Sequence, residues 1–285
     1  MTEIDFKRVD ILINLALEED VRGGDATSIS VIPHDLQITT RLVARENCVV
    51  AGLPVAEKVF KAVDDTISFE YIIRDGSTAE KGTLLAEIRG NAGNLLTAER
   101  TALNFLQRLT GVATASANYA KAVEGTDTVI LDTRKTTPAW RNLEKYAVAV
   151  GGSSNHRMGL YDRIMIKDNH RELAGLDGDK GITRSVKKAK TMFPALEIEV
   201  EADTLEEVKE AADAGADYIL LDNMSNEEMK SAVQINAGRS KLEASGGITL
   251  ERIPSIAAIG GIDFISVGAL THSVRAIDIS MEECR

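Results

Sequence analysis

The first part of the chain combines helical and extended hydrophobic patterns. Apolar residues at helical spacing predict an amphipathic helix over the first 21 residues, followed by a glycine-rich turn. Period-two patterns predict short strands within 37–90, interrupted by a helix near 55–63. A further apolar face predicts a helix from Leu95 to about Val123. Because these strands and helices do not alternate strictly, we expect an N-terminal α/β sandwich.

From residue 126 onward the pattern changes to short, buried-type strands separated by helical stretches that end in Gly and Ala. This alternation is the signature of parallel βα units. Six such strands fall short of the eight of a closed barrel, so we expect an open, incomplete α/β barrel. The predicted strands are 128–132, 162–167, 195–201, 218–222, 241–245 and 264–268.

Each of these predicted strands ends in polar residues or glycine. In a parallel barrel the carboxyl ends of all strands open on one rim, and ligands bind there. The same feature at six independent strands is hard to attribute to chance, so it predicts a site at this rim. The strand-end residues are Asp132–Thr133–Arg134–Lys135, Lys167–Asp168–Asn169–His170, Glu201, Asp222–Asn223, Ser245–Gly246–Gly247 and Gly268.

Composition excludes several classes of protein. The formal net charge of −11 over 285 residues argues against a general binder of nucleic acid or anionic membranes, because both would repel the chain. No apolar run is long enough to cross a bilayer, and no basic-then-apolar leader opens the sequence, so we expect a cytoplasmic protein. Two distant cysteines, Cys48 and Cys284, argue against a disulfide scaffold or a structural zinc site.

Positive charge is concentrated in one segment, 132–171, which holds eight Lys and Arg residues against four Asp and Glu residues. A cationic segment in an acidic protein indicates a local anionic ligand. Half of these cations lie at helical spacing or at a strand entry, and we expect them to be ordinary solvated charges: Arg141, Lys145, Arg163 and Arg171.

The other four cations lie at the predicted rim or in a loop beside it: Arg134, Lys135, Arg157 and Lys167. An Arg side chain offers a planar fork for carboxylate or phosphate, whereas Lys supplies a compact point charge. A ligand that carries both carboxylates and phosphates would use both types. The alternative interpretation is a network of internal ion pairs with the strand-end carboxylates.

Further strand-end residues suit a phosphorylated sugar. Gly246 and Gly247 in the segment 245–247, and Gly268 in the segment 266–269, follow the last two strands and would let backbone N–H groups approach a phosphate. Glu201 and Asp222 could hold Mg²⁺ or accept hydrogen bonds from sugar hydroxyls, or they could only neutralise nearby cations. His156 is a candidate donor to the ligand.

A series of motifs spread over nearly the whole chain matches one known family. Those in the cationic segment are TRKTTP (133–138), LEKYAV (143–148), GG (151–152), NHR (155–157) and IKDNH (166–170). Those outside it are EDVRGGDAT (19–27), AGLPVAE (51–57), ERTALNFLQRLTGVAT (99–114), IEVEA (198–202), ILLDNM (219–224), EASGGI (243–248) and ISVGALTHS (265–273). On these motifs the chain resembles the quinolinate phosphoribosyltransferases, also called nicotinate-nucleotide pyrophosphorylases.

The resemblance implies an N-terminal α/β sandwich at 1–113, which the C-terminal tail 272–285 could join, and an open, roughly seven-stranded α/β barrel at 114–271 that carries the active site. It implies a pentosyltransferase of NAD biosynthesis. The reaction converts quinolinate and phosphoribosyl pyrophosphate to nicotinate mononucleotide, pyrophosphate and CO₂, with Mg²⁺. Family members are homodimers or larger assemblies of dimers, including hexamers, in which a neighbouring subunit completes each active site.

The resemblance also assigns roles to residues. The substrate-binding positions are Arg134, Lys135, His156, Arg157 and Lys167, with Ser245, Gly246, Gly247 and Gly268 at the 5′-phosphate. The catalytic positions are Lys135, Lys167, Glu201 and Asp222, the last two also being candidate metal ligands. Arg100 matches the arginine that is supplied to the neighbouring subunit's site. Ala139, followed by Trp140, departs from the glycine usual after TRKTTP, beside the cationic segment.

Three other functions compete with this interpretation. A barrel aldolase would use Lys135 or Lys167 as a Schiff-base nucleophile, which borohydride would trap. A related transferase would use nicotinate itself, although the intact IKDNH motif and the number of cations favour a dicarboxylate. A non-catalytic phosphosugar-binding protein would bind the ligand and release no pyrophosphate.

Overall fold

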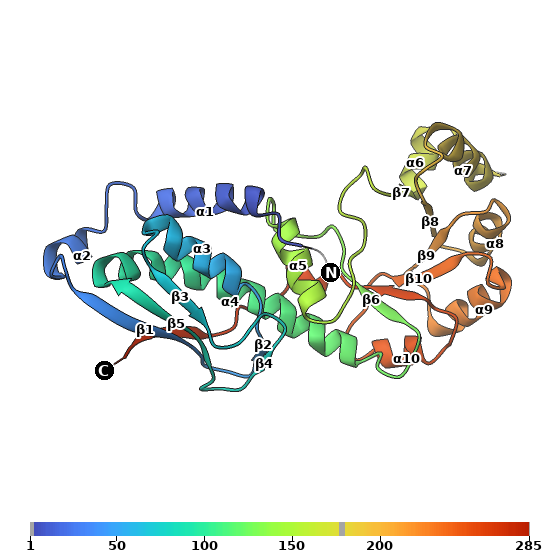
Figure 1. Ribbon diagram of the computed structural model, residues 1–285. Coiled ribbons are helices and arrows are strands. Elements are labelled where there is room, and N and C mark those ends of the chain that lie inside the picture. Colours follow the sequence, from blue (N-terminus) through green and yellow to red (C-terminus); the bar gives the residue numbers. More distant parts are fainter. Residues whose placement is uncertain (1–2, 177–179, 285) are drawn as a thin grey trace. The chain divides into compact units, whose positions relative to one another are not determined.

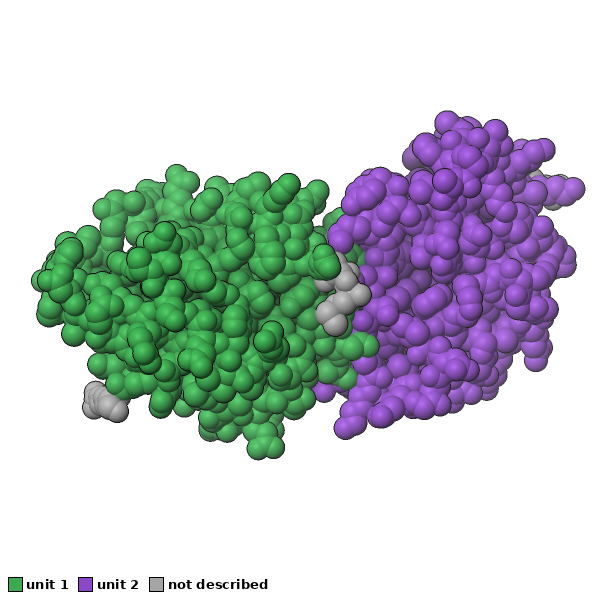
Figure 2. Space-filling model, viewed as in Figure 1, with its two compact units in different colours: residues 1–117, 136–152, 270–285 green, residues 118–135, 153–269 purple. Residues whose placement is uncertain are grey.

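The structure is a computed structural model that describes residues 3–176 and 180–284 (Figure 1). The chain divides into two compact units, shown in different colours in Figure 2. Unit 1 consists of residues 1–117, 136–152 and 270–285, and unit 2 of residues 118–135 and 153–269. The division expected from the sequence, at 113/114 with a returning tail at 272–285, placed 136–152 in the barrel instead.

Unit 1 is built on an antiparallel sheet with strand order β12-β1-β5-β3. Strand β1 pairs with both β5 and β12, so the C-terminal strand completes the sheet that the N-terminal half begins. The four strands are β1 (Gln37–Ala44), β3 (Ser68–Tyr71), β5 (Leu84–Asn91) and β12 (Ile279–Glu283). A separate short pair joins β2 (Cys48–Val49) to β4 (Thr78–Ala79).

The helices of unit 1 are α1 (Phe6–Asp20), α2 (Ala26–Val31), α3 (Leu53–Val63), α4 (Ala92–Lys121) and α5 (Arg141–Val150), with α11 (Ala269–His272) at the return from unit 2. Three of them, α1, α3 and α4, confirm the predicted apolar patterns, whereas α2 forms where the sequence predicted a turn. Helix α4 buries a continuous row of side chains that includes Leu95, Leu106 and Leu109. At Gly111 an added Cβ would lie 2.3 Å from the carbonyl oxygen of Arg275, so only glycine allows this close approach.

Polar anchors and apolar contacts hold segment 136–152 in unit 1. Glu144, fully buried on α5, accepts hydrogen bonds from the Thr137 N–H at 3.0 Å, the Thr137 hydroxyl at 2.9 Å and the Arg108 guanidinium at 2.9 Å. Trp140 stacks on Phe105 of α4 with 4.7 Å between ring centroids. The βα pattern alone places this helix between two barrel strands, and it contains no information about these distant partners.

Unit 2 contains a parallel sheet with strand order β6-β11-β10-β9-β8-β7. The strands are β6 (Val129–Leu131), β7 (Ile164–Ile166), β8 (Ile198–Ala202), β9 (Tyr218–Asp222), β10 (Lys241–Ser245) and β11 (Phe264–Ser266), so all six predicted strands are confirmed. Within the described residues no pairing joins β6 to β7, which makes the barrel open, and a parallel bridge between Leu131 and Ser154 extends it.

Helices connect most of these strands in sequence: α6 (Asp168–Leu173), α7 (Gly181–Met192), α8 (Leu205–Asp213), α9 (Asn226–Asn236) and α10 (Ile253–Ala257). Several begin with the expected capping chemistry. Ser225, for example, caps α9 by accepting a hydrogen bond from the Glu228 N–H, while the Glu228 carboxylate accepts one from the Ser225 N–H. No helix in the described part of the chain is both long and apolar enough to cross a membrane.

Candidate active site

The carboxyl ends of the strands in unit 2 surround a pocket of about 470 Å³, which we call the strand-end pocket. It gathers ten of the predicted site residues in one place: Arg134, Lys135, His156, Arg157, Lys167, Glu201, Asp222, Ser245, Gly246 and Gly247. The pocket exists because parallel strands all end on the same edge of the sheet. The remaining lining residues are Thr133, Met165, Leu220, Asn223, Glu243 and Ser266.

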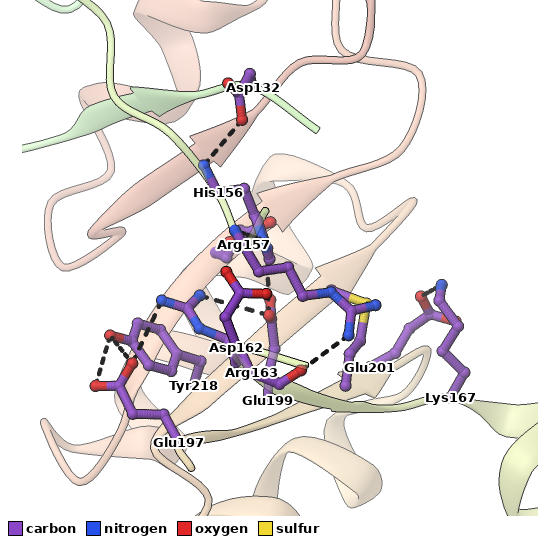
Figure 3. Close-up of polar contacts among 12 residues, drawn as sticks. Asp132, His156, Arg157, Asp162, Arg163, Lys167, Glu197, Glu199, Glu201 and Tyr218 are labelled. Atoms are coloured by element: carbon purple, nitrogen blue, oxygen red, sulfur yellow. Dashed lines mark hydrogen bonds and ion pairs between the residues drawn. The ribbon is translucent and has the colours of Figure 1, made fainter. Parts of the chain in front are cut away.

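Two arginines line this pocket close enough to affect each other. Burial lowers the pKa of Arg157, and the positive charge of Arg134 lowers it further. The Arg157 guanidinium is held in place by donating to the carbonyl oxygen of Arg163 at 2.9 Å (Figure 3). Like charges brought together in a partly buried site are stabilised when an anion binds between them. The arrangement therefore favours a negatively charged ligand.

Lys167 is the first residue after β7, and its ammonium group forms an ion pair with the carboxylate of Glu201 on β8 (Figure 3). The Lys167 side chain remains 38% exposed, whereas that of Glu201 is 12% exposed. Lys167 can therefore keep its partner and still present protons to a ligand, because an ammonium group has three donors. Removing Lys167 would leave a largely buried carboxylate unpaired.

The segments that follow the parallel strands β9 and β10 are in contact with each other. Asn223 donates from Nδ2 to Asp222 Oδ2 at 2.7 Å, and its backbone N–H donates to the Ser245 carbonyl oxygen at 3.0 Å. Gly246 has a φ of +87°, and an added Cβ there would lie 2.2 Å from Asn223 Oδ1. Glycine is therefore required at position 246. Because Ser245 pairs with Asp222, the end of β9 that carries the Asp222 side chain lies next to the loop at Gly246.

Acidic groups accumulate near the ends of β8 and β9. The pKa of Asp203 is raised first by burial and then by the negative charges of Glu207, Asp222 and Asp168. Such mutual repulsion shows that these carboxylates lie within electrostatic range of one another. The edge of the pocket that contains Glu201 and Asp222 is thus suited to cationic groups or to hydroxyl donors.

Below the cations lies a cluster that the sequence-based prediction missed: His156, Glu199 and Glu243, which we call the buried trio. The Nε2 atom of His156 lies 3.2 Å from Glu199 Oε2 and 3.4 Å from Glu243 Oε2 (Figure 3 labels the first two residues). Both glutamate side chains are fully buried. A carboxylate inside an apolar strand run, as in LEIEVE (196–201) and KLEAS (241–245), is a signal that could have revealed the cluster, because Glu is rarely buried without a partner.

His156 is positioned by contacts on every side. Its backbone N–H donates to Asp132 Oδ1 at 2.9 Å, and its Nδ1 accepts from the Arg157 N–H at 2.7 Å (Figure 3 shows the first). Burial alone would lower the pKa of His156, but Glu199 and Glu243 raise it to about 9. Since both ring nitrogens face protein groups, the ring does not offer the free donor to a ligand that the sequence led us to expect.

Two predicted site residues lie elsewhere. Arg100 is exposed on α4 of unit 1, where it lines a separate pocket of about 360 Å³ together with Glu19, Asp20 and Asn104. Gly268 follows β11 in unit 2 and is not among the residues that line the strand-end pocket. For both residues the roles implied by the resemblance remain predictions.

The expectation of four solvated cations is wrong for three of them. Lys145 is fully buried, and Arg171 is buried and forms an ion pair with Glu207 at 2.7 Å. Arg163 stacks on the Tyr218 ring, 3.9 Å from its centroid. Helical spacing reports which face of an element a residue occupies, but it does not report which face another element covers. Only Arg141, half-buried, comes close to the expectation.

The comparisons with known proteins agree with one another. The model of the family "Quinolinate phosphoribosyl transferase, C-terminal domain" matches residues 112–282, and that of the N-terminal domain matches 25–110. A probable nicotinate-nucleotide pyrophosphorylase (carboxylating) of Bacillus subtilis is 40% identical over 272 residues, covering 95% of this chain and 92% of the relative. The chloroplastic enzyme of Arabidopsis thaliana with the same name is 41% identical over 291 residues, covering 95% and 81%.

Solved structures give the same result. The crystal structure of NadC from Streptococcus pyogenes matches with a TM-score of 0.94 and 39% sequence identity over 100% of both chains. The nicotinate-nucleotide pyrophosphorylase of Francisella tularensis matches with a TM-score of 0.93 and 37% identity over 99% of this chain and 98% of that one. The similarity therefore extends over both units.

Proposed function

Because the chain belongs to the quinolinate phosphoribosyltransferase family, we propose that its strand-end pocket transfers the phosphoribosyl group of phosphoribosyl pyrophosphate to quinolinate. The products are nicotinate mononucleotide, pyrophosphate and CO₂, in NAD biosynthesis. One observation supports the assignment most strongly: four cations, two strand-end carboxylates and a glycine turn line a single pocket. A doubly acidic pyridine and a phosphorylated sugar need these groups together.

Recognition of quinolinate falls to the cations. The guanidinium groups of Arg134 and Arg157 match the planar geometry of carboxylates, and Lys167 supplies a compact charge at the next strand end. Each charge-assisted hydrogen bond contributes about 1.5–3 kcal/mol. Lys135 lies in the same wall and completes the positive field. The repulsion between Arg134 and Arg157 is relieved when the dianion binds, which adds to the preference for two carboxylates over one.

Transfer requires the pyridine nitrogen to attack C1 of the ribose as pyrophosphate leaves. The transition state has oxocarbenium character, so positive charge grows on the ribose. Glu201 and Asp222 lie at adjacent strand ends and would stabilise that charge, while the cations hold the ring in line. Glu201 can do this only while Lys167 keeps it oriented, because the two side chains form an ion pair.

Decarboxylation comes second in this scheme. Once the ring nitrogen carries the ribose, its positive charge stabilises the electron pair left at C2 when the bond to CO₂ breaks, and C2 then takes up a proton from solvent to give the mononucleotide. The protein then mainly orients the ring and provides an electrostatic environment that favours the loss of the neutral product CO₂. The Ser245–Gly246–Gly247 turn, whose geometry only glycine permits at position 246, would meanwhile bind the 5′-phosphate through backbone N–H groups.

The acidic edge of the pocket fits Mg²⁺. Carboxylate oxygens are the ligands this ion prefers, and it is usually held by one or two carboxylates together with substrate phosphates. Asp222 and Glu201 would hold it, and the neighbouring charges of Asp203 and Asp168 would favour a cation there. When bound, the ion would neutralise charge on the departing pyrophosphate.

A second subunit would complete the site. Arg100 does not line the strand-end pocket of its own chain but lies in the other unit, exposed beside Asn104 and two acids. In a homodimer, or a hexamer of dimers, this arginine would enter the pocket of the neighbouring chain, as the resemblance implies. An exposed guanidinium on a long, rigid helix is suited to that role, since the helix fixes its direction.

The proposed function is tested by incubating the protein with phosphoribosyl pyrophosphate, Mg²⁺ and quinolinate labelled at the C2 carboxyl group. We expect labelled CO₂ and nicotinate mononucleotide in equal amounts. In a parallel reaction with nicotinate we expect at most slow product formation. Nicotinate has a single carboxylate, so some of the cations that line the pocket would have no anionic group of the substrate to bind. Mononucleotide from nicotinate without CO₂ would instead identify the related transferase, and a borohydride-trapped adduct an aldolase.

A further inference from the structure

The buried trio has to accommodate more negative charge than its surroundings can neutralise. The oxygen atoms of Glu199 and Glu243 have no well-directed hydrogen-bond partner among the described residues, and both side chains are fully buried. Burying two ionised carboxylates side by side is costly, because each loses hydration and they repel each other. With a neutral imidazole ring, the guanidinium of Arg163 beside Glu199 offsets only one of these two charges, so one additional proton, or a cation, resides in the cluster.

The contacts decide where that proton goes. The Nε2 atom of His156 faces both carboxylates and carries the imidazole proton. A second proton on Nδ1 would displace the Arg157 N–H, which donates to that atom at 2.7 Å. The two carboxylates raise the pKa of His156 together, and this rise diminishes when one of them is neutral, so the extra proton of the trio lies on a carboxyl group and not on the ring. Glu199 lies 3.6 Å from the guanidinium of Arg163, which gives this carboxylate a counter-charge of its own. Glu243 is the remaining position.

We propose that Glu243 is kept as a neutral carboxylic acid below the cations of the strand-end pocket, and that this neutrality allows the pocket to accept a dianion. The proposal rests on the proposed function, since quinolinate is the dianion. Glu243 is a positioning residue here: it lines the pocket, and its proton satisfies the buried trio so that His156 stays fixed to the backbone of Arg157. An ionised Glu243 would place a negative charge under the carboxylates of the substrate.

The surroundings of Glu243 agree with a neutral acid. Burial, followed by the negative charge of Glu199, raises its pKa, and the nearby side chains of His156 and Ser266 only partly oppose this. The neighbouring strands present uncharged residues opposite it, Leu220 on β9 and Phe264 on β11. The titratable or charged groups that face it or line the same pocket are Glu199 on β8, His156 in the loop before β7, and Arg134, Arg157, Lys135, Lys167, Glu201 and Asp222.

The proposal predicts a specific pH dependence. The proposal places Glu243 in its neutral form at neutral pH, and because its folded-state pKa is raised, the acid ionises as pH increases further. We expect kcat/KM for quinolinate in the natural protein to fall by about tenfold per pH unit above that ionisation. The variant Glu243→Gln has no carboxyl group to ionise at this position, so its normalised profile should lack this fall. The control Glu206→Gln, an exposed carboxylate on α8, should reproduce the natural profile.

Coincident normalised profiles of the natural protein and Glu243→Gln would overturn the proposal. If circular dichroism shows that the variant does not fold, infrared spectroscopy of the natural protein replaces it: we expect a carboxylic acid C=O band that disappears over the pH range in which quinolinate affinity falls. A band that persists through that range contradicts the proposal. The proposal is also contradicted if the purified protein contains one equivalent of a divalent metal that Glu243→Gln has lost, because a cation would then neutralise the trio.

A natural protein that binds quinolinate with this pH dependence but forms no mononucleotide would refute the proposed function alone.

Discussion

Replacing Lys167 with Ala is expected to lower kcat/KM for quinolinate by at least about tenfold, or ~1.4 kcal/mol. Two effects combine in this variant. Quinolinate loses its interaction with the Lys167 ammonium group. The carboxylate of Glu201, whose side chain is only 12% exposed, loses its ion-pair partner, and its uncompensated negative charge then repels the incoming dianion. The loss should therefore appear in the Kd of quinolinate, measured by calorimetry, as well as in steady-state kinetics.

A second substitution separates the two effects. In Lys167→Ala/Glu201→Gln the unpaired charge is absent, so quinolinate should bind more tightly than to Lys167→Ala alone. Turnover should stay low, because we propose that Glu201 stabilises the transition state. Lys187→Ala, an exposed lysine on α7, is the matched control and should leave kinetics unchanged. Natural kcat/KM in both Lys167→Ala and Arg134→Ala would refute their assignment to the dicarboxylate.

Mixing two inactive variants should restore activity if a neighbouring subunit supplies Arg100. Arg100→Ala and Lys167→Ala remove groups that would reach the same site from different chains. In a mixed symmetric dimer one of the two sites then keeps both groups, so an equal mixture should recover about one quarter of natural activity once subunits exchange. The measurement is CO₂ release after the two variants are dissociated together and reassembled.

The structure offers a matched control for this experiment. Arg157 and Lys167 line the pocket of the same chain, so mixing Arg157→Ala with Lys167→Ala produces no intact site and should restore nothing. If the Arg100→Ala and Lys167→Ala mixture also remains at the level of its components, although exchange is demonstrated by differential labelling, then Arg100 does not act across a subunit boundary.

The barrel strands could be predicted well from sequence because each is a short apolar run that ends in polar residues. This pattern is local, and it also places the strand-end residues on one edge, as Arg134, Lys167, Glu201 and Asp222 illustrate. Parallel pairing then brings them together without any further information. The agreement thus has a physical basis in the periodicity of the strands.

Long-range partners explain what could not be predicted. Helix α5 belongs to unit 1 because Glu144 meets Arg108 and Trp140 meets Phe105, residues more than 30 positions away. Arg171 looked solvated until Glu207 is seen opposite it. The buried trio likewise depends on three separate segments, and only the presence of Glu in apolar strand runs hints at it.

Ala139 shows how a departure from the family pattern can be local. Its φ of +67° lies in the left-handed region that glycine adopts freely and that costs other residues roughly 1–2 kcal/mol. The residue is exposed, lies in unit 1 and is not among those that line the strand-end pocket. Its contribution is therefore backbone strain, and the stacking of Trp140 on Phe105 fixes the following helix.

The most direct test of the account is a crystal structure of the protein with quinolinate bound. We predict that the two carboxylates lie in the strand-end pocket, within hydrogen-bonding distance of Arg134, Arg157 and Lys167, with the ring nitrogen directed toward Glu201 and Asp222. Quinolinate bound at another place, or in this pocket without contact to any of those three cations, would contradict the central claim.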